Sequence, residues 1–574
     1  MKNFEVARLF YEMADLLDVR EESVFRIRAY QRAAQHLEAL AEDVAAVAAR
    51  GELQKLSGIG KDLAARIDEY LTTGRIAQLE TLRGALPPTF RTLLEVRGLG
   101  PKTAKVLFDR LGVDSIDRLE AMCRSGDVMR VAGIREKTCE NILKGIAIWR
   151  AGRRRMLLSH ARRIADQVIA TLRVHAPMDR IEVAGSLRRM RETVKDIDLL
   201  VTSREGKRVI ETFTSLPSVL EVLGAGDTRA SIHHTEGIQI DLRVVEPEAF
   251  GAAMQYFTGS KDHNVRLREI ASRKKLKVSE YGVFDETTGA RIAAATEPEV
   301  YEGIGLRYIP PELRENGGEI EAALAGTLPE LVTAEALRGD LHAHTEWSDG
   351  HHSLEKLIEA AEARGYEYVI VSDHSRSATI AKGLSPEQVL EQVRQIRALQ
   401  GRFRIRILAG SECDILGDGT MDFPPEVLRE LDFVLAAVHS RFKQSREEMT
   451  SRIVRALENP CVNVLAHPTG RLISSRDPYD VDMEAVLATA KRHGKAVEIN
   501  SSPERLDLKD THARRAVELG VPVAISTDTH YLSELDHVDL GLGVARRAWI
   551  RPESVINTWP VDELLAWAHR ARPA

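Results

Sequence analysis

The sequence is poor in cysteine and in long apolar runs. Its 574 residues include four cysteines, Cys123, Cys139, Cys413 and Cys461, and no Cys-x-x-Cys pair. Such sparse cysteines predict buried, reduced thiols in a cytoplasmic protein. No stretch approaches the roughly 18 apolar residues of a membrane span. The first residues carry acids from Glu5 onward and predict an amphipathic helix rather than a signal peptide.

The chain also lacks a strong net charge. Lys and Arg number 80 against 86 Asp and Glu, a net charge of −6, which argues against a purely electrostatic binder of nucleic acid. Residues 1–320 hold 50 Lys and Arg and 47 Asp and Glu, whereas the remainder holds 30 and 39. Contact with DNA is therefore expected from local basic patches in the first part. The length predicts three to five globular domains.

Two acidic residues mark the first candidate site. Asp196 and Asp198 begin an apolar run, and on a strand their spacing places both carboxylates on one face. Residues 237–245 alternate apolar and polar side chains and add Asp241 on the polar side. Adjacent carboxylates repel unless hard cations such as Mg²⁺ lie between them. Two metals held in this way clamp the attacking and leaving oxygens of a phosphoryl transfer.

A Gly-Ser turn lies upstream of these acids. Gly185 and Ser186 offer backbone N–H groups and a hydroxyl to phosphate oxygens, and Arg189 adds positive charge. Downstream, residues 256–264 read YFTGSKDHN. These segments and the three acids resemble the nucleotidyltransferase palm of family X DNA polymerases, the polymerase beta group.

The resemblance implies roles for further residues. Tyr256 and Phe257 would lie against the incoming sugar, and Asn264 would reach the nucleotide. The two acids of the Asp-x-Asp pair would bind both metals, and Asp241 would bind the catalytic one. Lys195 and Lys261 depart from the family pattern, which has Gly and Asp at these places, and both add positive charge near the expected triphosphate.

Two Gly-x-Gly hairpins precede this palm. Gly58 and Gly60 open one predicted helix, and Gly98 and Gly100 open another, which also carries Lys102. Glycines at a helix start expose backbone N–H groups that suit a phosphate. The two copies resemble helix-hairpin-helix motifs, which grip DNA backbones without reading the sequence.

The first 80 residues resemble the small helical domain of polymerase beta-like enzymes. The resemblance places Arg26 and Tyr30 in a pocket for a DNA 5′ end. It places Arg66 where those enzymes carry a lysine that forms a Schiff base, and Asp62 where they carry a phosphate-binding lysine. Arginine cannot supply the neutral amine that a Schiff base needs. We therefore expect no efficient lyase activity, although Lys61 begins the same helix.

A second chemistry begins near residue 337. Seven strand-like runs alternate with helical ones, which predicts a parallel β/α barrel. Metal-ligand residue types lie at or near the strand ends, where barrel active sites gather. They are His342, His344, Asp349, His374, Glu412, His439, His467, Asp528 and His530. Six imidazoles and three carboxylates suit two or three Zn²⁺ or Mn²⁺ ions. The pattern resembles the PHP domain, named for polymerases and histidinol phosphatases.

The resemblances together cover nearly the whole chain and imply a bacterial family X DNA polymerase with a C-terminal PHP domain. The expected fold is multidomain, with helical helix-hairpin-helix domains, an α+β palm and thumb, and a (β/α)7 barrel. The expected boundaries are 1–82 for the first helical domain, 83–150 for a fingers-type helical domain, 151–248 for the palm, 249–316 for the thumb, 317–336 for a linker and 337–574 for the PHP barrel.

The implied function is filling of short gaps in DNA repair, with gapped or primed double-stranded DNA and dNTP as substrates. The PHP barrel would act as a 3′-5′ exonuclease, and as an abasic-site endonuclease or 3′-phosphatase. Mg²⁺ or Mn²⁺ is expected at the palm, and the protein is expected to be a monomer associated with the nucleoid. The alternative is a non-templated nucleotidyltransferase whose PHP domain is a metal-bound scaffold, and template dependence would decide between the two.

Overall fold

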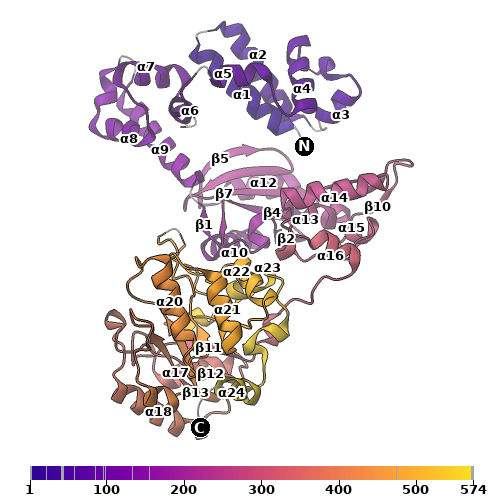
Figure 1. The fold of residues 1–574 in the computed structure, drawn as a ribbon. Helices are drawn as coiled ribbons and strands as arrows, with labels where there is room; N and C mark the ends of the chain where they lie inside the picture. Colours follow the sequence, from indigo (N-terminus) through magenta and orange to yellow (C-terminus); the bar gives the residue numbers. More distant parts are fainter. Residues whose placement is uncertain are drawn as a thin grey trace. The chain divides into compact units, whose positions relative to one another are not determined.

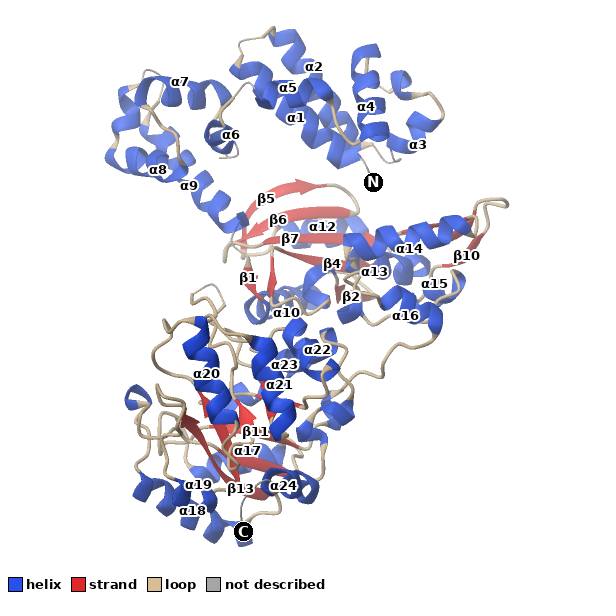
Figure 2. Cartoon of the chain, in the orientation of Figure 1, coloured by secondary structure: helices blue, strands red, loops and turns tan. Residues whose placement is uncertain are grey.

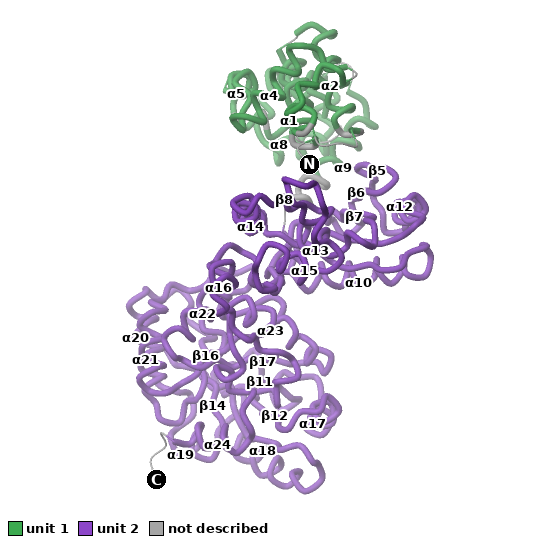
Figure 3. The backbone as a smooth tube through the Cα atoms, turned by 90° about the vertical axis from the view of Figure 1, so that its right-hand side faces the viewer, with its two compact units in different colours: residues 1–154 green, residues 155–574 purple. Residues whose placement is uncertain are grey.

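The computed structural model describes residues 3–20, 22–40, 44–56, 58–84, 86–94, 96, 99–131, 134–153, 155–473 and 475–570. They form two compact units, residues 1–154 and 155–574, which Figure 3 colours separately. Among these described residues, no helix is both long enough and apolar enough to cross a membrane.

Unit 1 is helical and is built around two cores. Phe10, Leu37 and Ile67 lie in the first core, and Leu93 and Leu107 lie in the second. All five side chains are buried, as the apolar periodicity of their helices requires. The α-helices described in this unit are α1 (Asn3–Val19), α2 (Val24–Ala39), α3 (Val44–Ala49), α4 (Lys61–Thr73), α5 (Ala77–Gly84), α6 (Pro88–Leu94), α7 (Pro101–Leu111), α8 (Ile116–Ser125) and α9 (Glu136–Arg153).

Unit 2 begins with the palm, a sheet with strand order β2-β4-β7-β6-β5 (Figures 1 and 2). Ile197, Leu199 and Val201 of β4 pack into one core with residues of α10 and α12, so the acids of the same strand point to the other face. The elements are β1 (Met156–Leu157), α10 (Leu158–His175), β2 (Arg180–Val183), α11 (Gly185–Arg188), β3 (Thr193–Val194), β4 (Asp196–Thr202), α12 (Gly206–Thr214), β5 (Val219–Ala225), β6 (Arg229–His234) and β7 (Gln239–Val245).

The thumb follows as helices around a small antiparallel sheet of order β10-β9-β8. Its elements are α13 (Phe250–Thr258), α14 (Lys261–Arg273), β8 (Leu276–Ser279), β9 (Gly282–Asp285), β10 (Arg291–Ala293), α15 (Glu297–Gly303) and α16 (Glu319–Ala325). The expected linker 317–336 is not a free connector. Ile320, Ala323 and Leu331 join the thumb core, and the carboxylate of Glu319 contacts His263 Nδ1 at 2.7 Å.

The last part is a parallel barrel with strands in sequence order, β11 to β17. An isolated bridge joins Ala343, at the end of the first strand, to Thr529, three residues after the last strand, so the predicted seven-stranded parallel barrel is nearly closed. The strands are almost wholly buried, as helices on the outside require. They are β11 (Gly339–Ala343), β12 (Tyr368–Val371), β13 (Arg406–Asp414), β14 (Phe433–Ala437), β15 (Val464–Leu465), β16 (Ala496–Asn500) and β17 (Val523–Ser526).

The α-helices described in this part of the chain lie around the barrel in Figure 2. They are α17 (Leu354–Ala363), α18 (Pro386–Leu399), α19 (Pro425–Glu430), α20 (Arg446–Leu457), α21 (Met483–His493), α22 (Asp510–Glu518), α23 (Val538–Arg547) and α24 (Val561–His569). The four cysteines are free and buried, as their sparse use predicts.

Candidate metal centres and DNA-binding hairpins

The three predicted carboxylates of the palm lie side by side. β4 and β7 pair in parallel, and their register puts Asp198 directly opposite Asp241. Asp196 begins β4 and shares a face with Asp198. Asp241 is held in place because Gln239 Nε2 donates to both of its oxygens, at 3.1 and 2.9 Å, and Ser231 Oγ donates to Oδ1. The sequence gives no signal for the Ser231 contact, which depends on the pairing of β6 with β7.

Burial raises the pKa of Asp196 and of Asp198, and the neighbouring carboxylates raise both further. The pKa of Asp198 reaches about 7. The side chains around the cluster thus supply too little positive charge to keep all of its carboxylates ionised at neutral pH. A set of three carboxylates at one end of a sheet suits Mg²⁺ or Mn²⁺, which prefer oxygen ligands.

Gly185 makes room for one of these acids. Its φ is +63°, a region that favours glycine, and a Cβ there would lie 2.1 Å from Asp198 Oδ2. The N–H of Ala184 donates to the carbonyl of Asp198 at 2.8 Å, which fixes the turn against β4. Ser186 follows in the same turn, so the predicted phosphate-binding residues lie next to the acids.

The predicted nucleotide-binding segment lies on α13 and α14. The rings of Tyr256 and Phe257 meet edge to face, with centroids 5.1 Å apart. Arg243, two residues after Asp241 on β7, lies over the Phe257 ring at 4.5 Å. Asn264 Nδ2 donates to the carbonyl of Tyr256 at 2.7 Å, so Asn264 ties the two helices together.

Arg189 has partners that the sequence did not predict. Its Nε donates to Glu315 Oε1 at 3.0 Å, and its Nη1 donates to the carbonyl of Thr258. Glu315 is 126 residues away in the chain, so no local pattern could reveal the pair. The guanidinium predicted to hold the triphosphate is therefore already held in a defined orientation.

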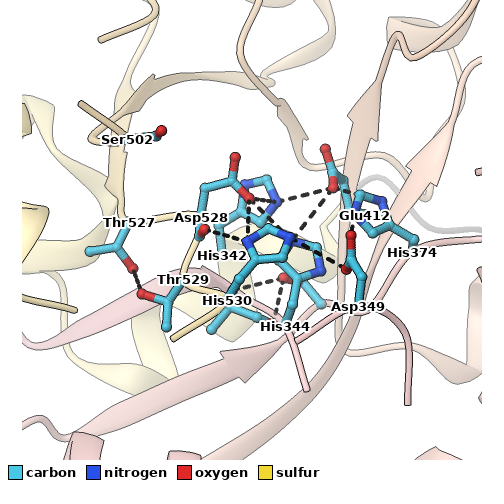
Figure 4. Close-up of polar contacts among 12 residues, drawn as sticks. His342, His344, Asp349, His374, Glu412, Ser502, Thr527, Asp528, Thr529 and His530 are labelled. Atoms are coloured by element: carbon cyan, nitrogen blue, oxygen red, sulfur yellow. Dashed lines mark hydrogen bonds and ion pairs between the residues drawn. The ribbon is translucent and has the colours of Figure 1, made fainter. Parts of the chain in front are cut away.

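The barrel brings together all nine predicted metal-ligand residues. Figure 4 labels seven of them, and His439 and His467 contact Glu412, at 3.2 and 2.6 Å from its Oε1. Glu412 on β13 is central: His342 Nε2 lies 3.3 Å from Oε2, and His467 Nε2 lies 2.6 Å from Oε1. The ligand atoms of eight of the residues fall into three groups in which all atoms lie within 4.8 Å of one another. These groups are His344, Asp349, His374 and His530; His342, His344, Glu412 and Asp528; and His374, Glu412 and His439.

The imidazole nitrogens of this cluster fit metal ions better than they fit hydrogen-bond partners. His342 Nε2 and both ring nitrogens of His344 are buried and make no hydrogen bond, although carboxylates lie close by. Buried polar atoms of this kind are costly unless a ligand satisfies them. Imidazole and carboxylate together suit Zn²⁺ or Mn²⁺.

Two carboxylates outside the predicted set orient the imidazoles. Glu498 Oε1 lies 2.7 Å from His342 Nδ1, and its Oε2 accepts from the backbone N–H of His467 at 2.7 Å. Asp414 contacts His439 Nδ1 in the same way. A carboxylate behind a metal-binding histidine fixes the ring and its tautomer. The sequence shows Glu498 at a strand end, but its role depends on the fold.

Neighbouring charges and burial shift the pKa values of the histidines in the barrel cluster in opposite directions. Burial alone would lower the pKa of His439, but Glu412 and Asp414 outweigh it and raise that pKa to about 10. At His344, burial and the neighbouring His374 and His530 outweigh the opposing effect of Asp528 and lower the pKa to about 3. Perturbed groups gathered in one site are typical of functional centres.

The hairpins of unit 1 match their prediction in part. Gly58 has φ +78°, Gly60 precedes α4, and Gly100 precedes α7, whereas Gly98 lies outside the described residues. Backbone N–H groups thus face outward at both helix starts. Lys102 is exposed, with its Nζ 3.3 Å from Asp18 Oδ1.

The two residues of the expected 5′-end pocket differ in their exposure to solvent. Arg26 is exposed and pairs with Glu22 at 3.4 Å, which leaves it near the surface. Tyr30 is instead 5% exposed, and its ring packs edge-on against Phe10. Its ring belongs to the first core of unit 1, and its hydroxyl donates to Gln78 Oε1 at 3.3 Å, so a contact of Tyr30 with DNA stays a prediction.

Known protein families match along the chain. The helix-hairpin-helix domain matches residues 1–76, and the SAM-like helix-hairpin-helix tandem matches residues 90–147. The DNA polymerase beta thumb matches residues 253–315, and the PHP domain matches residues 340–502. These matches agree with the folds of the two units.

One relative matches from end to end. The chain is 36% identical over 575 residues to the DNA polymerase/3′-5′ exonuclease PolX of Bacillus subtilis (strain 168). The aligned residues cover 99% of this chain and 100% of that protein. The chain belongs to the PolX family. Part of the chain is also similar to shorter proteins. It is 29% identical over 231 residues to a probable phosphatase of Thermoanaerobacter sp. (strain X514), covering 38% of this chain and 89% of that protein.

PolX membership agrees with the fold class predicted from the sequence: helix-hairpin-helix domains, a polymerase thumb and a PHP barrel. It also agrees with the predicted use of divalent metals, although the ions are not identified. A probable phosphatase of Acetivibrio thermocellus is similar to part of the chain as well. The two are 29% identical over 228 residues, which cover 38% of this chain and 90% of that protein.

Proposed function

We propose that this chain is a DNA-directed DNA polymerase that fills short gaps in DNA repair and carries a separate 3′-5′ exonuclease on its PHP barrel. The observation that carries the polymerase assignment is the pairing of Asp198 with Asp241 on parallel strands, beside Asp196. The end-to-end match to PolX of Bacillus subtilis supports the same function. Gapped or primed double-stranded DNA and dNTP are the substrates, and DNA as a substrate implies association with the nucleoid.

In the palm, the chain's own residues would orient the reactants. Asp196 and Asp198 would hold two Mg²⁺ or Mn²⁺ ions, and Asp241 would lie nearest the primer 3′-hydroxyl. Such ions supply charge stabilisation for an in-line phosphoryl transfer. Arg189 and the Gly185 turn would hold the triphosphate, with Ser186 as a hydroxyl donor in the same turn.

In the barrel, nine residues would hold two or three Zn²⁺ or Mn²⁺ ions. These ions supply a nucleophile for phosphoester hydrolysis at neutral pH. A cavity of about 200 Å³ opens beside Asp528 and His530, and Arg505 lines it with its Nε 3.4 Å from Asp528 Oδ2. A cation next to a small cavity suits one phosphate group of a DNA end. A 3′-terminal nucleotide, an abasic site or a 3′-phosphate would present such a group.

The two activities should be separable, because they rest on different ligand sets. Asp196→Ala with Asp198→Ala should abolish nucleotide incorporation on a gapped duplex and leave phosphoester hydrolysis. His342→Ala with His344→Ala should do the reverse. The assay follows a labelled primer with and without dNTP, in Mg²⁺ or Mn²⁺. Loss of hydrolysis in the folded palm variant would overturn the assignment of two independent sites.

A further inference from the structure

The palm and the barrel of unit 2 meet at the residue predicted to hold the triphosphate. Arg189 follows the Gly185 turn, and its side chain is 13% exposed. Glu315 and the carbonyl of Thr258 receive its hydrogen bonds, so the orientation of its guanidinium is set before any nucleotide binds. Burial and the neighbouring acids raise the pKa of Asp198, and Arg189 opposes that rise in part, so its positive charge acts on the palm acids.

Glu315 is held in turn by a residue of the barrel. Arg547, the last residue of α23, donates from Nη1 to Glu315 Oε1 at 2.9 Å and to the main-chain carbonyl of Arg189 at 2.9 Å. Its Nε donates to Asp510 Oδ2 at 2.9 Å. One guanidinium therefore contacts both the backbone of Arg189 and the carboxylate that orients the Arg189 side chain. Arg547 itself is 6% exposed.

The charge of Glu315 is shared among several guanidiniums. Burial would raise the pKa of Glu315, but Arg189 and Arg547 outweigh burial and lower that pKa, so Glu315 is ionised at neutral pH. Arg191 lies 3.9 Å from the same Glu315 oxygen. Three guanidiniums, those of Arg189, Arg191 and Arg547, thus lie close to the carboxylate of Glu315. Loss of Arg547 would leave that carboxylate to the other two.

The neighbouring arginine of the same helix has different contacts. Arg546 Nε donates to Glu312 Oε1 at 2.7 Å, and Nη1 donates to the carbonyl of Val332 at 3.1 Å. It fastens the thumb segment to the barrel as Arg547 does, but none of its contacts reaches Arg189. The two residues therefore form a matched pair, in which only one touches the predicted nucleotide site.

We infer that Arg547 is a positioning residue for the polymerase reaction, so that nucleotide use by the palm depends on a side chain of the PHP barrel. The inference rests on the proposed function of the palm. Arg547 fixes the backbone of Arg189, so Arg189 is preorganised. Arg547 also shares the negative charge of Glu315, so Glu315 neutralises Arg189 only in part and Arg189 keeps positive charge for a triphosphate. Preorganised groups bind more tightly because less ordering remains to be done on binding.

The test compares Arg547→Met with Arg546→Met in the full chain. Both variants keep an apolar stem and remove a guanidinium. Arg547→Met should raise the KM for dNTP in gap filling about tenfold, the loss expected for one charge-assisted contact, with kcat changed less than about twofold. Arg546→Met should leave the KM for dNTP unchanged. Exonuclease activity should stay at the wild-type level in both variants, which reports that the barrel is folded.

Two further variants separate positioning from general stability. With Arg189→Ala as the background, Arg547→Met should have no additional effect on the KM for dNTP. Arg547→Lys should restore only part of the wild-type KM, because an ammonium cannot reach three oxygens as the guanidinium fork does. The inference is overturned if Arg547→Met leaves the KM unchanged, if Arg546→Met raises it equally, or if the effect persists without Arg189. Absence of incorporation by the wild-type chain would instead refute the proposed function.

Discussion

Gly185→Ala tests how far the palm depends on a glycine that carries no chemistry of its own. A Cβ at this position would lie 2.1 Å from Asp198 Oδ2 and 3.1 Å from its Cγ. Because non-bonded atoms of this kind do not approach within about 3 Å, the carboxylate or the turn must move by about 1 Å. Either movement separates the Gly-Ser turn from the metal-binding acid.

The expected size of the effect follows from that displacement. A shift of about 1 Å in a reacting geometry costs about 100-fold in rate, which corresponds to about 2.7 kcal/mol in the activation free energy. An alanine at the left-handed φ of +63° would be strained, which would lower the free energy of unfolding by about 1 kcal/mol. Catalysis should thus suffer more than stability does.

Gly289→Ala is the matched control. Gly289 has φ +72° in the thumb, and a Cβ there would meet nothing within 4 Å. It carries the same strain without the clash, so its incorporation rate should stay near the wild-type value. The assay measures single-nucleotide gap filling at saturating dNTP, with thermal unfolding and exonuclease activity in parallel. Incorporation by Gly185→Ala within about threefold of wild type would refute the reasoning.

Three more predictions follow from the same sites. Tyr256→Ala should raise ribonucleotide use relative to deoxyribonucleotide use in insertion assays, and an unchanged ratio would place the sugar gate elsewhere. The apparent affinity for Mg²⁺ in nucleotide incorporation should rise from pH 6 to pH 8, because the pKa of Asp198 is about 7 and protons compete with the metal ion below that pH. An apparent affinity that stays constant in Mg²⁺ titrations across this range would contradict this. Borohydride trapping should give no strong adduct with a 5′-deoxyribose phosphate, because an arginine cannot form the Schiff base of a lysine and Arg66 pairs with Glu69 at 3.2 Å. An adduct lost in Lys61→Ala would contradict this.

Sequence periodicity predicted the parts of both centres that lie on strands. The alternation of residues 237–245 was enough to place Asp241 on a polar face, and the register of β7 with β4 then brings it opposite Asp198. The barrel ligands could be predicted because parallel strands end at one rim, whatever the helices between them do. In both cases, local geometry and a simple topology determine where the side chains meet.

The unpredicted features depend on contacts between distant residues. Arg547 and Glu315 are 232 residues apart, and Glu498 and His342 are 156 apart, so neither pair leaves a local signal. Tyr30 shows a second limit. A tyrosine on an amphipathic helix can face DNA or the core, and only the packing of α1 against α2 decides for the core.

The two centres also balance their charges in opposite ways. In the palm, burial and like charges raise the pKa of Asp198, so protons occupy carboxylates that a metal would need. In the barrel, burial would raise the pKa of Glu412, but the surrounding histidines outweigh it and hold that pKa well below its usual range. The competing protons therefore sit on imidazoles such as His439, whose pKa is raised to about 10. Acid would weaken metal binding at both centres through different groups, and a shared pH profile would not imply a shared catalytic residue.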